Sequence, residues 1–91
     1  MLAGVTRQDL LTFPCDYPIK VMMRAGVELR AQVDAVIGRH AGAAVAAAAT
    51  ERPSAQKNFS SVTYTIYARD AAHIAVLFAE LKDIRGVLMV L

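Results

Sequence analysis

The chain has a single cysteine, no long apolar run and no block of like charge. Because Cys15 stands alone among 91 residues, an intrachain disulfide and zinc sites that need several thiolates are excluded. The longest apolar run, residues 41–49, is far shorter than the roughly 20 residues that cross a bilayer. Arg7 and Asp9 interrupt the segment in which a signal peptide needs an unbroken apolar core. We therefore expect a protein of the reducing cytoplasm that does not enter the membrane.

Charge is balanced as well. The formal net charge is +2, and no run of like charge exceeds two residues. In so short a chain a few side chains set the sign of the net charge, so a slight basic excess is weak evidence for a nucleic-acid partner. The length suits one small domain.

Motifs that carry catalysis are missing. No Gly-rich phosphate loop, nucleophile elbow or metal-binding box occurs in the sequence. Cys15 has no histidine at a local spacing that could serve as its base. His40 is expected near the end of a helix and His73 in the exposed first turn of another, without metal-ligand spacing. Asp70 and Glu80 are explained by a helix cap and a solvated helix face. We expect neither an enzyme nor a bound metal or other cofactor.

Apolar periodicity predicts the first elements. Residues 17–23 alternate apolar and polar positions, which is typical of a half-buried strand. From Val27 the apolar residues follow helical spacing, with Arg30 and Asp34 among the residues that face away from the core. Gly42 is a plausible stop for this helix.

The second half of the chain continues the pattern. Residues 43–50 are rich in alanine and could extend the helix, but the preceding glycine and the need for a neighbouring strand favour an edge strand. Residues 61–68 form the clearest strand of the sequence. Asp70 is placed to cap a second helix, Gly86 breaks that helix, and residues 87–91 are predicted to form a last strand.

The resulting order is strand, helix, strand, strand, helix, strand, which is that of the ferredoxin-like βαββαβ fold. This fold belongs to the α+β class and consists of a four-stranded antiparallel sheet with two helices on one face. We expect a single domain over residues 13–91 and a lead segment over residues 1–12. Leu10 and Leu11 of this segment are expected to dock together with Phe13 on the sheet or the helices.

Four segments of the chain are distinctive: FPCDYPIKVMM (13–23), SVTYTIYA (61–68), LFAEL (77–81) and VLMVL (87–91). Together they resemble the YbeD-like family of uncharacterised bacterial proteins, and the resemblance covers residues 10–91. It implies a ferredoxin-like domain similar to the ACT regulatory domains of amino-acid metabolism. Family members have been proposed as lipoate-related regulators.

ACT domains contact their ligand through the turn after the first strand. The resemblance therefore implies a ligand pocket at Arg24, Ala25, Gly26 and Val27, or else at a subunit interface. One departure is Met23, where relatives often carry a glycine. The turn glycine of this chain is Gly26 instead.

The sheet face that no helix covers is a second candidate region. A mixture of polar and apolar groups on an uncovered face often marks a contact site. The unpaired edges of the sheet offer another route, because a second subunit can pair with them. Either contact would make a homodimer. The face is expected to present Lys20, Met22, Thr63, Thr65 and Tyr67, with Leu88 and Val90 beside them.

RNA binding is the alternative function. Residues 57–64, KNFSSVTY, partly follow the RNA-recognition signature. Base stacking needs aromatic side chains on the open sheet face, and Ser61 occupies the second stacking position. The agreeing positions are mainly core positions, so nucleic acid is disfavoured as a partner. The residues that would bind it are Lys20, Lys57, Arg69 and Tyr67.

These patterns favour one function over the others. We expect a non-catalytic regulatory module that binds a small metabolite or a partner protein and acts as a homodimer. The sequence does not choose between face-to-face and edge-to-edge association of two copies.

Overall fold

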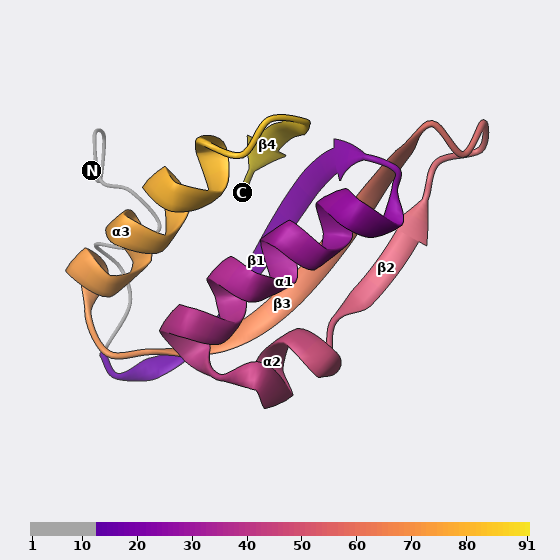
Figure 1. The fold of residues 1–91 in the computed structure, drawn as a ribbon. Coiled ribbons are helices and arrows are strands. Elements are labelled where there is room, and N and C mark those ends of the chain that lie inside the picture. Colours follow the sequence, from indigo (N-terminus) through magenta and orange to yellow (C-terminus); the bar gives the residue numbers. More distant parts are fainter. Residues whose placement is uncertain (1–12) are drawn as a thin grey trace, which may run out of the picture.

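The computed structural model describes residues 13–91, and the order of its elements is the predicted one with one helix added (Figure 1). The four strands form one antiparallel sheet in the order β2-β3-β1-β4. The predicted ferredoxin-like α+β fold is therefore confirmed. The elements are β1 (Cys15–Arg24), α1 (Val27–Ala41), α2 (Ala43–Ala47), β2 (Thr50–Pro53), β3 (Phe59–Ala68), α3 (Ala71–Lys82) and β4 (Val87–Val90).

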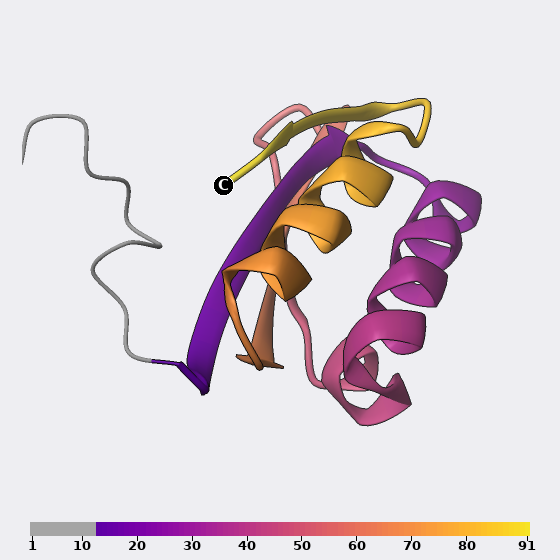
Figure 2. The ribbon, with the colours of Figure 1, turned by 90° about the vertical axis from the view of Figure 1, so that its left-hand side faces the viewer.

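The helices α1 and α3 lie side by side on one face of the sheet (Figure 2). The central strands β1 and β3 run antiparallel along their full length, with Tyr17 opposite Ile66 and Val21 opposite Val62. Every second residue of both strands is buried beneath the helices, as the alternation predicted. The opposite face, which we call the open face, carries the remaining side chains of the strands.

The alanine-rich segment 43–50 is not the predicted edge strand. Ala43–Ala47 forms the short helix α2, and the edge strand is Thr50–Pro53. Gly42 separates α2 from α1 with φ +98°, a conformation that residues with a side chain rarely adopt. Alanine has the highest helix propensity, and the short helix buries Ala46 in the core. The more polar residues that follow pair with β3 instead.

The strand β4 is irregular. Its register against β1 shifts next to Met22, which pairs with Met89. Such a bulge changes which side chains face the core. Val90 is buried in the core, so the prediction that it lies on the open face is wrong, whereas Leu88 is exposed as predicted.

The docking predicted for the lead segment can be followed only at Phe13. Residues 1–12, including Leu10 and Leu11, lie outside the described residues. Phe13 is half-buried and packs against the core. No helix between residues 13 and 91 is long and apolar enough to span a bilayer.

Candidate functional site

A hollow lies where the turn after β1 meets the start of α1 and the turn between α3 and β4. The backbone N–H of Arg24 donates to the carbonyl oxygen of Gly86 at 2.9 Å. The N–H of Ala25 donates to the carbonyl oxygen of Asn58 at 2.9 Å. These two bonds hold the turn between two other loops, so its shape is fixed by three separate parts of the chain.

This hollow, which we call the turn pocket, has a volume of about 610 Å³. Its wall includes the whole predicted ligand turn, and the structure therefore brings those four residues together at one cavity. Their role in binding stays a prediction. The lining residues are Arg24, Ala25, Gly26 and Val27, joined by Glu28, Leu29, Gln32, Arg85 and Gly86.

The charges around the turn pocket favour an anion. The N-cap residue of α1 is Gly26, which offers no side chain to cap the first N–H groups of the helix. The positive end of the helix dipole therefore lies at the pocket. Arg24 and Arg85 add two guanidinium groups, and neither forms an ion pair with a carboxylate among residues 13–91. Glu28 adds one negative charge, which leaves the positive groups in excess.

A glycine allows the close packing at the base of the turn pocket. Gly86 has φ +100°, and a Cβ atom placed there would lie 2.7 Å from Cδ2 of Leu29. This distance is too short for two carbon atoms, so the end of the Leu29 side chain would have to shift. The positive φ of Gly86 is the stronger reason for a glycine at this position, because residues with a side chain rarely adopt it.

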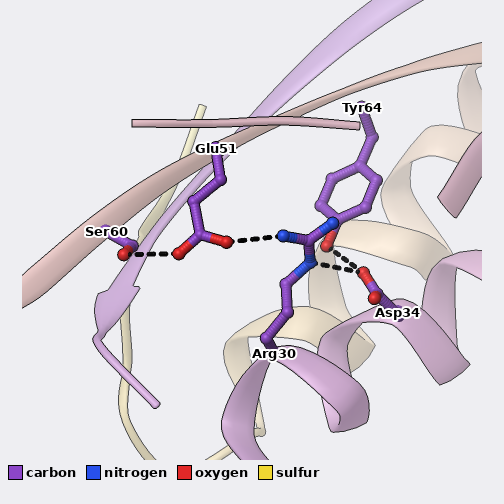
Figure 3. Close-up of polar contacts among 5 residues, drawn as sticks. All are labelled: Arg30, Asp34, Glu51, Ser60 and Tyr64. Atoms are coloured by element: carbon purple, nitrogen blue, oxygen red, sulfur yellow. Dashed lines mark hydrogen bonds and ion pairs between the residues drawn. The ribbon is translucent and has the colours of Figure 1, made fainter. Parts of the chain in front are cut away.

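A polar cluster lies between α1 and the β2–β3 edge of the sheet, and we call it the Arg30 network (Figure 3). The guanidinium of Arg30 contacts Asp34 at 2.9 Å and Glu51 at 2.6 Å. The hydroxyl of Tyr64 donates to the same Asp34 oxygen at 2.6 Å. The hydroxyl of Ser60 donates to the other oxygen of Glu51 at 2.7 Å. The network therefore joins one helix to two strands.

The sequence prediction that Arg30 and Asp34 face away from the core is wrong. Their side chains are only 25% and 33% exposed, and they cover the hydroxyl of the buried Tyr64. A buried tyrosine hydroxyl needs a partner, and an arginine four residues before an aspartate is a common helical pair. These two signals could have located the network. The hydrogen-bond donors and acceptors of the network pair with one another, which is typical of a structural cluster rather than a reactive one.

Tyr64 gives the protein a stability that depends on pH. Burial, and then the hydrogen bond to Asp34, raises the pKa of Tyr64 above its usual value of 10.0. The folded chain therefore keeps a proton that the unfolded chain loses above about pH 10. Below that pH the contribution is fully present. Above it we expect the free energy of unfolding to fall by about 1.4 kcal/mol per pH unit from this group.

Urea unfolding of the wild-type protein and of Tyr64→Phe, between about pH 8 and pH 11.5, checks this expectation. Lysines and the other tyrosines titrate in both proteins, so only the difference between the two slopes belongs to Tyr64. Equal slopes would contradict the assignment.

The two histidines join α1 to α3, and His73 is buried rather than exposed as predicted. Its Nε2 lies 3.0 Å from the carbonyl oxygen of His40, and its Nδ1 accepts from the N–H of Arg69 at 3.3 Å. Asp70 accepts from the N–H of His73 at 2.8 Å, which confirms the predicted helix cap. His40 contacts Glu80 at 2.5 Å, so Glu80 is not simply solvated. In the described part of the chain no cluster of three or more such side chains could hold a metal ion.

The residues that would bind RNA do not lie together on the open face. Phe59 and Tyr67 are both exposed, but they lie near the two ends of β3, about 26 Å apart. Lys57 and Arg69 flank the same strand at opposite ends. A stacking platform needs neighbouring aromatic side chains. The predicted interaction residues share this face, namely Lys20, Met22, Thr63, Thr65 and Tyr67.

Two solved structures share this fold. The ACT domain of the GTP pyrophosphokinase of Chlorobium tepidum superposes with a TM-score of 0.61 at 16% identity, over 85% of this chain and 97% of that one. The C-terminal domain of the MgtC protein of Mycobacterium tuberculosis superposes with a TM-score of 0.62 at 18% identity, over 90% of this chain and 89% of that one. The ACT-like fold implied by the resemblance is therefore confirmed.

Sequence relatives cover almost the whole chain. A UPF0250 protein of Vibrio cholerae is 42% identical over 84 residues, which are 92% of this chain and 89% of that protein. A UPF0250 protein of Edwardsiella ictaluri is 40% identical over 83 residues, 91% of this chain and 93% of that protein. These relatives confirm the YbeD-like resemblance. Residues 8–91 match the family described as protein of unknown function (DUF493), and the chain belongs to that family.

Proposed function

We propose that this protein is a non-catalytic regulatory module whose turn pocket binds a small anionic metabolite. The proposal rests on one observation. Arg24 and Arg85 stand at the uncapped start of α1, and neither has an ion-pair partner among residues 13–91. Unpaired cations beside a helix N-terminus attract a carboxylate or a phosphate.

The fold and the family support a regulatory role. One structural neighbour is an ACT domain, and the resemblance to ACT domains implies ligand contact through this same turn. The turn pocket has no nucleophile with an adjacent base, which favours binding over catalysis. Lipoate, to which the family resemblance points, is a carboxylate and belongs among the candidate ligands.

We also propose that the protein acts as a homodimer in the cytoplasm. Among residues 13–91 no strand pairs with the outer edge of β4, and β4 contains no proline, whereas β2 ends at Pro53. An edge without proline can pair with the same edge of a second copy. Native mass spectrometry of the protein purified gently from its own cells reports subunit number and retained small molecules in one experiment.

The binding site itself is tested with two charge-neutral variants. The probes are amino acids, lipoate, acetate and inorganic pyrophosphate, and the readout is the amide spectrum in NMR titrations. We expect at least one probe to shift the amides of residues 25–29. We expect Arg24→Gln and Arg85→Gln each to weaken that binding by about tenfold, because each removes a charge-assisted contact.

Lys82→Gln is the matched control, since it removes a cation from the end of α3 and Lys82 does not line the turn pocket. Its affinity for the probe should equal that of the wild-type protein. A probe bound equally well by Arg24→Gln, Arg85→Gln and the control would refute the turn pocket as the anion site. A monomer by native mass spectrometry would refute the homodimer.

A further inference from the structure

A second hollow of about 440 Å³ lies on the open face, across all four strands. The register explains its position. Arg52 of β2 lies opposite Ser61 of β3, Ser61 opposite Met22 of β1, and Met22 opposite Met89 of β4. Ser61 is the smallest side chain of this row, so the sheet is hollowed between its larger neighbours. We call this hollow the sheet-face pocket.

The walls of the sheet-face pocket are mainly apolar. Met22 is 39% exposed, Phe59 40% and Leu88 55%, and all three line the hollow. The irregular register of β4 is what brings Leu88 to this side of the sheet. Apolar walls with a few polar groups, and a volume above about 300 Å³, are typical of small-molecule sites.

One cation stands at the edge of these apolar walls. Arg52 lines the sheet-face pocket and forms no ion pair within residues 13–91. Lys20 and Arg24 lie nearby on the same face, on β1, and are likewise without an ion pair in that part of the chain. The acidic residue of that strand, Asp16, lies near its other end, opposite Tyr67. The sheet-face pocket therefore combines an apolar floor with a positive edge.

This charge pattern decides between two kinds of occupant. A second copy of the chain, packed face to face about a two-fold axis through this pocket, would bring the three cations of each copy together, and like charges in a contact are unfavourable. A small molecule with an apolar tail and one carboxylate matches both properties of the pocket. The carboxylate would form an ion pair with the guanidinium of Arg52, and the tail would cover the exposed apolar side chains of the pocket.

We propose that the sheet-face pocket binds a monocarboxylate with an apolar tail. The tail lies between Met22, Phe59 and Leu88, and the carboxylate pairs with Arg52. This site is separate from the turn pocket, because the two share no lining residue. The protein would then carry two ligand sites of different chemistry.

The test uses decanoate as the probe at concentrations below its micelle range. Decan-1-ol supplies the same tail without the charge, and acetate supplies the charge without the tail. In NMR titrations we expect decanoate to shift the amides of Met22, Ser61 and Leu88. Arg52→Gln should weaken decanoate binding about tenfold and leave decan-1-ol binding unchanged. Ser61→Trp should abolish the binding of both, because the indole fills the hollow.

Further variants separate this site from the other interpretations. Arg85→Gln should reduce anion binding at the turn pocket and leave decanoate affinity within about twofold, since Arg85 lines the turn pocket and not the sheet-face pocket. If Ser61→Trp does not fold, Leu88→Asn takes its place as the test of the pocket. It removes one apolar wall and should weaken the binding of both decanoate and decan-1-ol. Equal decanoate affinity in wild type and Arg52→Gln, or shifts confined to other residues, would overturn the proposal. A concentration-dependent dimer that Ser61→Trp abolishes would overturn it in favour of a contact between copies.

Discussion

Asp34→Ala is expected to lower the free energy of unfolding by about 3 kcal/mol, because it leaves one buried donor and one partly buried donor without their acceptor. One is the hydroxyl of Tyr64, a residue with no exposed surface, and the other is Nε of Arg30. Tyr64→Phe should cost only about 1 kcal/mol, since Asp34 keeps its contact with Arg30. Urea unfolding curves with unchanged m-values measure both effects.

The double variant gives the sharper result. In Asp34→Ala/Tyr64→Phe the hydroxyl that needs an acceptor is gone, so the double variant should be more stable than Asp34→Ala alone by about 1 kcal/mol. A non-additive pair of this kind shows that the cost of Asp34→Ala arises from a stranded polar group. If the two single effects simply add, the hydroxyl of Tyr64 does not depend on Asp34, and the Arg30 network is wrongly described.

Replacement by alanine is expected to change the free energy of unfolding in opposite directions at two glycines, Gly86 and Gly38. Gly86→Ala is expected to destabilise the protein by about 2 kcal/mol, mainly because φ +100° is unfavourable for alanine; the new Cβ, 2.7 Å from Cδ2 of Leu29, also makes the end of that side chain shift. Gly38→Ala should stabilise it by about 0.5 to 1 kcal/mol, since Gly38 lies within α1 and a Cβ there has no neighbour within 4 Å.

Thermal and urea unfolding of the two variants measure these differences, with Gly38→Ala as the matched control for Gly86→Ala. Because Leu29 lines the turn pocket, Gly86→Ala should also shift the amides around Gly26 in the absence of any ligand. A stability of Gly86→Ala equal to that of wild type would contradict the expected strain, because it would show that neither the positive φ of residue 86 nor the shift of Leu29 costs free energy.

Much of the fold could be predicted from short-range patterns. The alternation in β1 and β3 and the cap at Asp70 depend on neighbours within a few positions, so the sequence shows them directly. The prediction of an edge strand over residues 43–50 was wrong, because alanine is small enough to suit a strand and also has the highest helix propensity, so periodicity does not distinguish the two. Val90 was placed on the wrong face because one extra residue in β4 reverses the alternation, and a bulge leaves no periodic signal.

The two pockets could not be predicted from sequence patterns alone, because residues from distant segments of the chain form them. The turn pocket was located only through the family resemblance, and Arg85, which completes its charge, follows α3 in the sequence. His73 was expected in solvent because the sequence does not show that the end of α1 covers it. The sheet-face pocket was missed because the small size of Ser61 matters only once larger side chains from the other strands lie around it.

The strand β2 is short, and all four of its residues are exposed. It is attached by its ladder to β3 and by the ion pair between Glu51 and Arg30, with little apolar burial of its own. Local opening of a folded protein begins at elements of this kind. If β2 detached, the ten-residue strand β3, rich in tyrosine, threonine and valine, would become a free edge that can nucleate aggregates. The contacts that hold β2 in place, namely its ladder to β3 and the contacts of Glu51 with Arg30 and Ser60, thus also keep the edge of β3 covered.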